Sequence, residues 1–265
     1  MLRDLAPKRA REEWAAARRA EGQYGIQLRK IARHVGHLIR GFDLENEYDA
    51  SLLSEALQRY ATLLTPWAKS AGRRMIAEVS ARSDEQWRKV AKEMGANFKE
   101  LFGSDDQIGI RYRQLQAEQV ELITSIPRDA ALRVHELIRN GVLEGKRFTE
   151  IVPEIQRGGE VSKSKANTIA RTETGRVVTN LTQARSESVG SEGYIFRTVR
   201  DAQVRPSHKA MEGKFVRWDG PPTLDGITAH AGAFINCRCF PEPVIPMQIM
   251  DRRRTADRRM TCEAA

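Results

Sequence analysis

The window from residue 201 to residue 239 constrains the fold and function of this chain more than any other stretch. It reads DAQVRPSHKAMEGKFVRW, continues through a loop rich in proline and glycine, and closes with HAGAFINCRC. Two of the three cysteines and two of the five histidines fall inside it. Charged helices are expected before it and a charged tail after it. We therefore expect the rest of the chain to carry and place this window.

The residues before the window predict helices. Charged residues make up 30% of the chain and aromatic residues 6%, a balance typical of helices with narrow apolar stripes and solvated outer faces. Breaks between helices are expected at residues 22–25, near Leu64 before Pro66, at Ser83 and at Pro127. The longest stripe of apolar residues spaced by three or four is Leu53, Leu57, Tyr60, Leu64, Trp67, Ala71 and Met75.

The periodicity stays helical after residue 145 and changes to strand-like at residues 194–199. A short helix is expected over 148–156 and a longer one from Ser162 or Ser164, followed by strands over 194–199, 214–218 and 233–240 and a short helix at Pro206. The predicted class is α+β: a mainly α-helical arm or bundle, then a small α+β module. The predicted domains are a helical docking region over 1–160, the module over 161–243, and a basic tail over 244–265.

The two cysteines of the CRC sequence suggest a metal site. Alternate side chains of a strand share a face, so Cys237 and Cys239 are expected to point the same way. Two thiolates on one face can bind one metal ion, with His208, His230 or Asp201 as further ligands. Four nitrogen and sulfur ligands would make a closed structural Zn²⁺ site. The alternative is that both cysteines are small buried apolar side chains.

An enzymatic reading of the same residues stays open. His208, Asp201 and Cys237 could act as base, orienting carboxylate and nucleophile. A metal-dependent hydrolase or nuclease would use His208 and the two thiols, with Asp201 or Glu212 as the nearby carboxylate that acts as general base. Four protein ligands would indicate a structural metal, and three ligands plus water would indicate catalysis. The helices contain no catalytic constellation, so we expect a protein that is not an enzyme.

The charge of the chain indicates acidic partners. Its net charge is +9 and its pI about 9.7, so it should attract nucleic acid or an acidic protein face. Basic residues gather over 1–33 and again over 252–259, which predicts contacts with DNA phosphates through both segments. A free DNA-binding protein is the alternative. Three cysteines suit a reducing cytoplasm, and we expect neither a signal peptide nor a membrane span.

Several motifs in a fixed order resemble the phage Mu F-like head morphogenesis family of minor head proteins. They are IARTETGRVVTN, a strand leading into DAQVRPSHKAMEG, and NCRC after a loop containing proline, and the resemblance covers residues 127–243. The family pattern matches at Arg171, Thr172, Glu173, Asp201, Arg205, His208, Gly213, Asn236, Cys237, Arg238 and Cys239.

This resemblance implies a structural protein of the virion. Such a protein is present in few copies at the portal vertex inside the phage head, and in the host cytoplasm during assembly. It would act in head assembly and in the packaging or delivery of DNA. The implied partners are the portal protein, the major capsid or scaffold protein, and packaged DNA.

Overall fold

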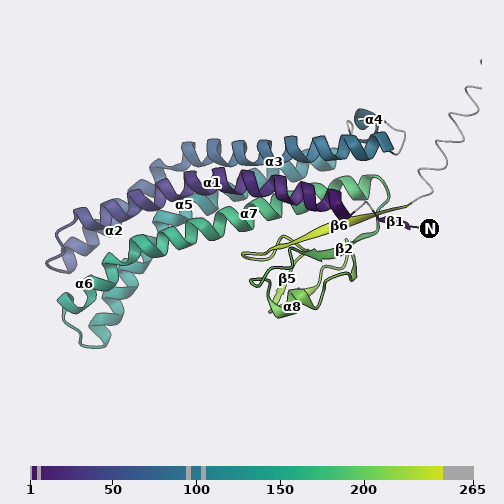
Figure 1. Cartoon of the computed structure of the whole chain (residues 1–265). Helices are drawn as coiled ribbons and strands as arrows, with labels where there is room; N and C mark the ends of the chain where they lie inside the picture. The colour runs from purple at the N-terminus through teal and green to yellow at the C-terminus, as the bar shows by residue number, and fades with distance from the viewer. Residues whose placement is uncertain (1, 5–6, 94–96, 103–105, 247–265) are drawn as a thin grey trace, which may run out of the picture. The chain divides into compact units, whose positions relative to one another are not determined.

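The computed structural model describes residues 2–4, 7–93, 97–102 and 106–246 (Figure 1). Long helices make up most of the described residues before residue 189, and a small antiparallel sheet combines residues 2–4 with strands that follow these helices, so the predicted α+β class is confirmed. The helices are α1 (Pro7–Gly41), α2 (Glu47–Leu63), α3 (Thr65–Glu93), α4 (Phe98–Phe102), α5 (Asp106–Leu143), α6 (Phe148–Gln156), α7 (Gly158–Ser188) and α8 (Pro206–Lys209). The strands are β1 (Leu2–Asp4), β2 (Gly193–Thr198), β3 (Phe215–Arg217), β4 (Thr223–Leu224), β5 (Ile227–Thr228) and β6 (Cys239–Pro246).

Two predicted helix boundaries are confirmed. The break near Leu64 separates α2 from α3, and Pro66 lies in the first turn of α3, where a missing backbone N–H costs little. The helix expected over 148–156 is α6, with Arg147 as its N-cap. The side chain of Asn46 caps α2 by accepting hydrogen bonds from the backbone N–H groups of Tyr48 and Asp49.

Three other predicted breaks are wrong. Helix α1 continues through residues 22–25, α3 through Ser83, and α5 through Pro127. Packing explains each case, because Tyr24, Ser83 and Ile126 are all buried at or beside the expected break. Tertiary burial therefore outweighs the local preference for a helix end.

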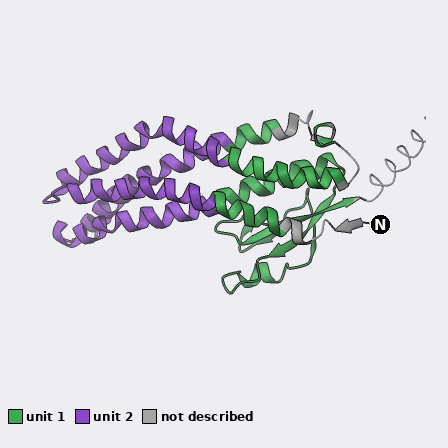
Figure 2. Cartoon of the chain, turned by 45° about the horizontal axis from the view of Figure 1, so that its top comes forward, with its two compact units in different colours: residues 1–20, 76–115, 172–265 green, residues 21–75, 116–171 purple. Residues whose placement is uncertain are grey.

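The chain forms two compact units (Figure 2). Unit 1 consists of residues 1–20, 76–115 and 172–265, and unit 2 consists of residues 21–75 and 116–171. Each unit collects segments that are distant in sequence. This division follows packing, and the predicted functional boundaries at residues 160 and 243 stay predictions.

Unit 2 is helical. Its core joins apolar faces of α1, α2, α5 and α6, and α1 also approaches α7 closely. A Cβ atom added at Gly159 would lie 3.1 Å from the Cα atom of Gly36, so this approach depends on two glycines. The buried core residues are Val35, Ile39, Ala50, Leu53, Leu57, Ala130, Ala131, Val134, Ile151 and Ile155.

Unit 1 contains the sheet, with antiparallel strands in the order β1-β6-β2-β3. Strands β4 and β5 form a separate hairpin inside the stretch expected to be an irregular loop. The strand predicted over 233–240 is wrong in its bounds, because β6 begins only at Cys239. The core of the module contains Tyr194, Phe196, Val204, Val216, Trp218, Ala231, Phe234, Cys237 and Cys239.

In the part of the chain that the structure describes, no helix is both long enough and apolar enough to cross a membrane.

Candidate functional site

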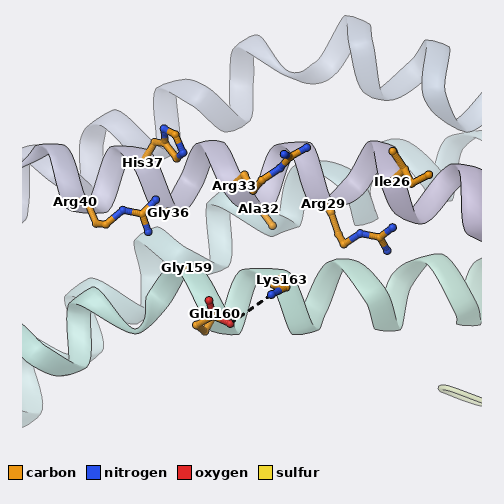
Figure 3. A pocket seen from close by; sticks show the side chains of 10 residues that line it. All are labelled: Ile26, Arg29, Ala32, Arg33, Gly36, His37, Arg40, Gly159, Glu160 and Lys163. Atoms are coloured by element: carbon orange, nitrogen blue, oxygen red, sulfur yellow. Dashed lines mark ion pairs between the residues drawn. The ribbon is translucent and has the colours of Figure 1, made fainter.

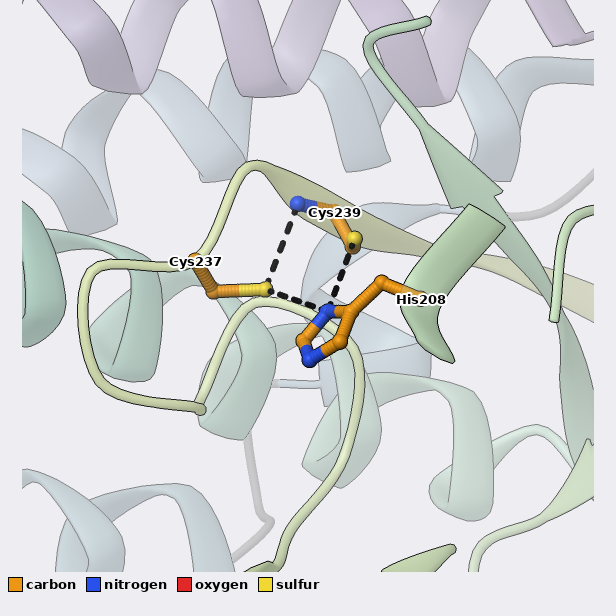
Figure 4. A group of neighbouring side chains, drawn as sticks. All are labelled: His208, Cys237 and Cys239. Atoms are coloured by element: carbon orange, nitrogen blue, oxygen red, sulfur yellow. Dashed lines mark hydrogen bonds between the residues drawn. The ribbon is translucent and has the colours of Figure 1, made fainter. Parts of the chain in front are cut away.

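The structure brings three of the five candidate metal ligands, His208, Cys237 and Cys239, together inside unit 1 (Figure 4). The Nδ1 atom of His208 lies 3.3 Å from Sγ of Cys239 and 3.6 Å from Sγ of Cys237. The three side chains are almost fully buried, with exposed fractions of 2% for His208, 3% for Cys237 and 0% for Cys239. We call these residues the His-Cys-Cys cluster.

Local structure explains how His208 reaches the cluster. Pro206 begins the short helix α8, and its fixed φ angle suits the first helical position. The imidazole of His208 lies against the rings of Phe234 and Phe196, with ring centroids 4.7 and 6.1 Å apart. These aromatic contacts fix the ring and cover it from solvent.

The two sulfurs meet by a different route from the one predicted. Cys237 precedes β6, so the two cysteines do not share a strand face. Asn236 has a φ of +55°, which turns the chain just before Cys237. The backbone N–H of Cys239 then donates to Sγ of Cys237 at 3.4 Å. A tight turn, and not strand alternation, therefore holds the sulfurs together.

The electrostatics of the cluster favour one thiolate. Hydrogen bonds from the Cys239 thiol, from His208 and from the Cys239 backbone lower the pKa of Cys237 despite its burial. The hydrogen bond to Sγ of Cys237, burial and the negative charge on Cys237 raise the pKa of Cys239. Of the two thiols, that of Cys237 is therefore the more acidic.

A carboxylate lies behind His208. Oδ2 of Asp225 is 3.9 Å from His208 Nε2, and it accepts hydrogen bonds from Ser207 Oγ at 2.9 Å and from Arg205 at 3.4 Å. Asp225 and Gly226 both have positive φ angles, at 53° and 77°, and form the turn between β4 and β5. This hairpin therefore places a negative charge on the far side of the imidazole.

His230 and Asp201 lie outside the cluster. His230 is half-buried, with Nδ1 3.3 Å from the Tyr194 hydroxyl and its ring against Trp218. Burial lowers the pKa of His230, which favours the neutral ring. Asp201 accepts a hydrogen bond from Arg238 at 2.6 Å. The structure assigns these two residues contacts other than metal binding.

Helix α7 carries a face that the sequence reasoning missed. Thr172 Oγ1 accepts from the backbone N–H of Asn236 at 2.9 Å, and Thr179 Oγ1 donates to the carbonyl of Ala231 at 2.8 Å. Between them, Gly175 lies directly against Gly232. The spacing of residues 172, 175 and 179 places them on one helical face, and this spacing of small residues was the available signal. The face positions the loop that leads to Cys237.

Most other motif residues make contacts within the same module. Arg205 donates to the carbonyl of Ile235 at 2.6 Å, and Gly213, with a φ of +80°, donates its N–H to Phe196. Glu173 is buried and pairs with Arg176 at 3.1 Å. Arg171 instead lies in unit 2, where it pairs with Glu21 at 3.3 Å.

Glu212, a candidate general base of the hydrolase alternative, is engaged in hydrogen bonds within the module. Its carboxylate accepts hydrogen bonds from the backbone N–H of Thr198 at 2.7 Å, from the Thr198 hydroxyl at 2.8 Å and from Arg200 at 3.0 Å. Burial opposes ionisation, but these hydrogen bonds lower the pKa of Glu212 overall. Its geometry and its acidity favour a structural carboxylate.

Unit 2 contains a groove of about 540 Å³ between α1 and α7, and four of its ten lining residues are arginine or lysine (Figure 3). Arg29, Arg33 and Arg40 follow one face of α1, and Lys163 extends from α7. Glu160 is the acidic residue of the lining, 3.9 Å from Lys163. We call this the cationic groove.

One protein family matches part of this chain. Residues 133–241 match the family described as Phage Mu protein F like protein, which confirms the predicted resemblance over that segment. An uncharacterised protein of Haemophilus influenzae is 27% identical over 156 residues, covering 59% of this chain and 34% of that protein. The NAD(+)--arginine ADP-ribosyltransferase EFV of Enterococcus faecalis is 32% identical over 122 residues, covering 42% of this chain and 25% of that protein.

The chain thus spans about a third and a quarter of the length of these two relatives. No solved structure gives a significant match.

Proposed function

Because residues 133–241 carry a Phage Mu protein F like domain, we propose that the chain is a minor head protein that acts in phage head morphogenesis. It binds the portal protein inside the capsid in few copies, assists head assembly, and takes part in DNA packaging or delivery. The observation that carries this proposal is the family match over that segment. The hydrogen bonds from the Asn236 N–H to Thr172 and from Arg205 to the carbonyl of Ile235 support it, because they give several motif residues a shared structural role.

The proposed location is tested in heads assembled with and without the chain. We expect it to co-purify with the portal from nuclease-treated, disrupted heads, in far fewer copies than the major capsid protein. Preparations made without it should contain fewer complete heads and should lose infectivity, because fewer genomes are packaged or ejected. Quantitative mass spectrometry of purified heads measures the copy number. Absence of the chain from purified heads would overturn the proposal, and cross-linking would reveal contacts with capsid or scaffold protein.

We further propose that packaged DNA contacts the cationic groove of unit 2. Arg33 and Arg40 are exposed, and within the described residues neither has an ion-pair partner. Unpaired guanidinium groups on one helical face suit a row of phosphates, because each binds a phosphate oxygen pair without first losing a carboxylate. The basic segment predicted after residue 246 lies outside the described residues.

Reversing two groove charges should weaken DNA binding. We expect Arg33→Glu with Arg40→Glu to lower the affinity for duplex DNA by about tenfold or more. The slope of log affinity against log salt concentration should also become shallower, by the amount that corresponds to about two lost phosphate contacts. The matched control is Arg73→Glu with Arg74→Glu, two exposed arginines on α3. Both double variants change the net charge of the chain equally, so an equal loss of DNA affinity in both would contradict a role for the groove. Fluorescence anisotropy across a salt series measures both quantities.

We propose no enzymatic activity for the chain. The hydrolase alternative needs a free general base, and Glu212 is occupied by Thr198 and Arg200. It also needs a reactive centre that substrate can reach, whereas the His-Cys-Cys cluster is buried. One relative is named as an ADP-ribosyltransferase, but the match covers only 25% of that protein. We do not extend its activity to this chain.

A further inference from the structure

We propose that unit 1 holds one structural zinc ion, bound by Nδ1 of His208 and by the Sγ atoms of Cys237 and Cys239. This site goes beyond the proposed role in the phage head and does not depend on it. The proposal rests on the spacing of the donors, on the number of hydrogen bonds that they can make, and on the group behind His208.

The spacing of the donor atoms fits a tetrahedral ion. Zinc binds imidazole nitrogen at about 2.0–2.1 Å and thiolate sulfur at about 2.3 Å, so tetrahedral angles place these donors about 3.5 Å apart. The observed distances from His208 Nδ1 are 3.3 Å to Cys239 and 3.6 Å to Cys237. All three donor atoms lie within 4.8 Å of one another. An ion can therefore enter with little movement of the chain.

Hydrogen bonding alone satisfies this arrangement poorly. A neutral imidazole nitrogen either accepts one hydrogen bond or donates one, yet both sulfurs lie within 3.6 Å of the same Nδ1 atom of His208. One buried sulfur is then left with only the weak contact that it makes to another sulfur or to a backbone N–H. A cation between the three atoms interacts with all of them at once.

The second nitrogen of His208 supports the same assignment. Nε2 is buried and makes no hydrogen bond to any described residue, and Asp225 Oδ2 lies 3.9 Å away. When Nδ1 binds a metal, the remaining proton resides on Nε2 and points toward a carboxylate or carbonyl partner in most such sites. Asp225, held by Ser207 and the β4–β5 turn, is placed for that role.

Burial indicates a structural and not a hydrolytic zinc. Three protein donors are one fewer than a closed structural site normally has, so the ligand count alone would allow catalysis. A hydrolytic zinc must expose its fourth position to substrate. Here the donors are at most 3% exposed, and Phe234 covers the imidazole. A buried water molecule could complete the tetrahedron without contact with solvent.

The first test uses the full-length wild-type chain, purified under reducing conditions. We expect about one zinc per chain by elemental analysis. Replacement by cobalt(II) should give the intense visible bands of a tetrahedral ion and thiolate-to-metal charge-transfer bands. Less than about a tenth of an equivalent of zinc after incubation with the ion, or a cobalt spectrum without sulfur bands, would overturn the site. A cobalt spectrum altered by added azide would overturn the structural role.

Variants test which residues bind. Cys237→Ser and Cys239→Ser should each lose most of the zinc, while Cys262→Ser, which removes the third thiol of the chain, should retain it. Asp225→Asn should keep the stoichiometry but weaken zinc affinity by about 10–100-fold. Retention of zinc by both Cys237→Ser and Cys239→Ser, or its loss from Cys262→Ser, would contradict the assignment. The wild-type cobalt spectrum decides the question even if a variant fails to fold.

Discussion

Replacing Arg185 with methionine is expected to lower the free energy of unfolding by about 3–5 kcal/mol. The Arg185 side chain on α7 is 3% exposed and donates hydrogen bonds to Ser83 and Asp84 of α3. The Ser83 hydroxyl in turn donates a hydrogen bond to Glu13 of α1 at 2.5 Å. The variant would leave Glu13 buried without its nearby positive charge, and that uncompensated charge causes most of the loss.

The same substitution at the surface provides the control. Arg59 on α2 pairs with Glu55 four residues earlier, and its side chain is 79% exposed. Arg59→Met should cost less than about 1 kcal/mol, because solvent already screens that pair. Urea unfolding followed by circular dichroism measures both variants. If Arg185→Met costs no more than Arg59→Met, the buried network does not stabilise the fold.

The pH dependence of the free energy of unfolding gives an independent check of the role of Glu13. Burial raises the pKa of Glu13 above its usual value, and hydrogen bonding to Ser83 and the charge of Arg185 only partly oppose this. A raised pKa in the folded state favours folding below the unfolded pKa, and this contribution is lost as the pH rises through the folded value. In Arg185→Met the folded pKa should rise further, so the loss in stability should be smaller near pH 5 than near pH 8. Glu13→Gln in that background should remove the difference.

The long helices could be predicted from sequence, but their continuity could not. The stripe ending at Met75 predicted helical structure for α2 and the first part of α3, and Pro66 predicted the boundary between them correctly. The expected breaks at Ser83 and Pro127 failed because the reasons for continuity lie elsewhere in the chain. Ser83 contacts Glu13, which is 70 residues away. Local rules assign a polar residue to a helix end when no distant partner is visible.

The candidate site shows the same limit. The types of residue predicted a cluster of His208, Cys237 and Cys239, and the structure brings these three together. The expected strand geometry was wrong, since it required knowledge of the positive φ at Asn236. His230 was included because it is close in sequence, but Tyr194 and Trp218 determine where its ring lies. The cationic groove was missed because it pairs α1 with α7, which are far apart in the chain.

The motif on α7 gains a physical meaning from the cluster. Thr172, Gly175 and Thr179 hold the loop of residues 231–236, and this loop ends at Cys237. The motif IARTETGRVVTN therefore contains the residues with which α7 packs against this loop. Changes at that surface should act on the position of the cysteine and so on the metal site proposed above.

Gly175→Ala tests this connection, because the substitution should destabilise the protein where helix propensity alone predicts the reverse. A Cβ atom at Gly175 would lie 2.4 Å from the carbonyl oxygen of Gly232 and 3.2 Å from the ring of Trp14. The oxygen belongs to the backbone and Trp14 is buried, so neither can move aside easily. Overpacking of this kind costs about 1–3 kcal/mol, which should outweigh the gain of about 1 kcal/mol from replacing a helical glycine.

Gly22→Ala is the matched control, and the sign of its effect should be opposite. Gly22 lies inside α1, and an added Cβ atom would meet nothing within 4 Å. The variant should gain about 0.5–1 kcal/mol from helix propensity. Denaturant unfolding compares the two, and zinc affinity measured on the same samples should fall only in Gly175→Ala. Stabilisation by both substitutions would show that α7 does not hold the loop in the way the structure describes, and unchanged zinc affinity would separate the loop from the metal site.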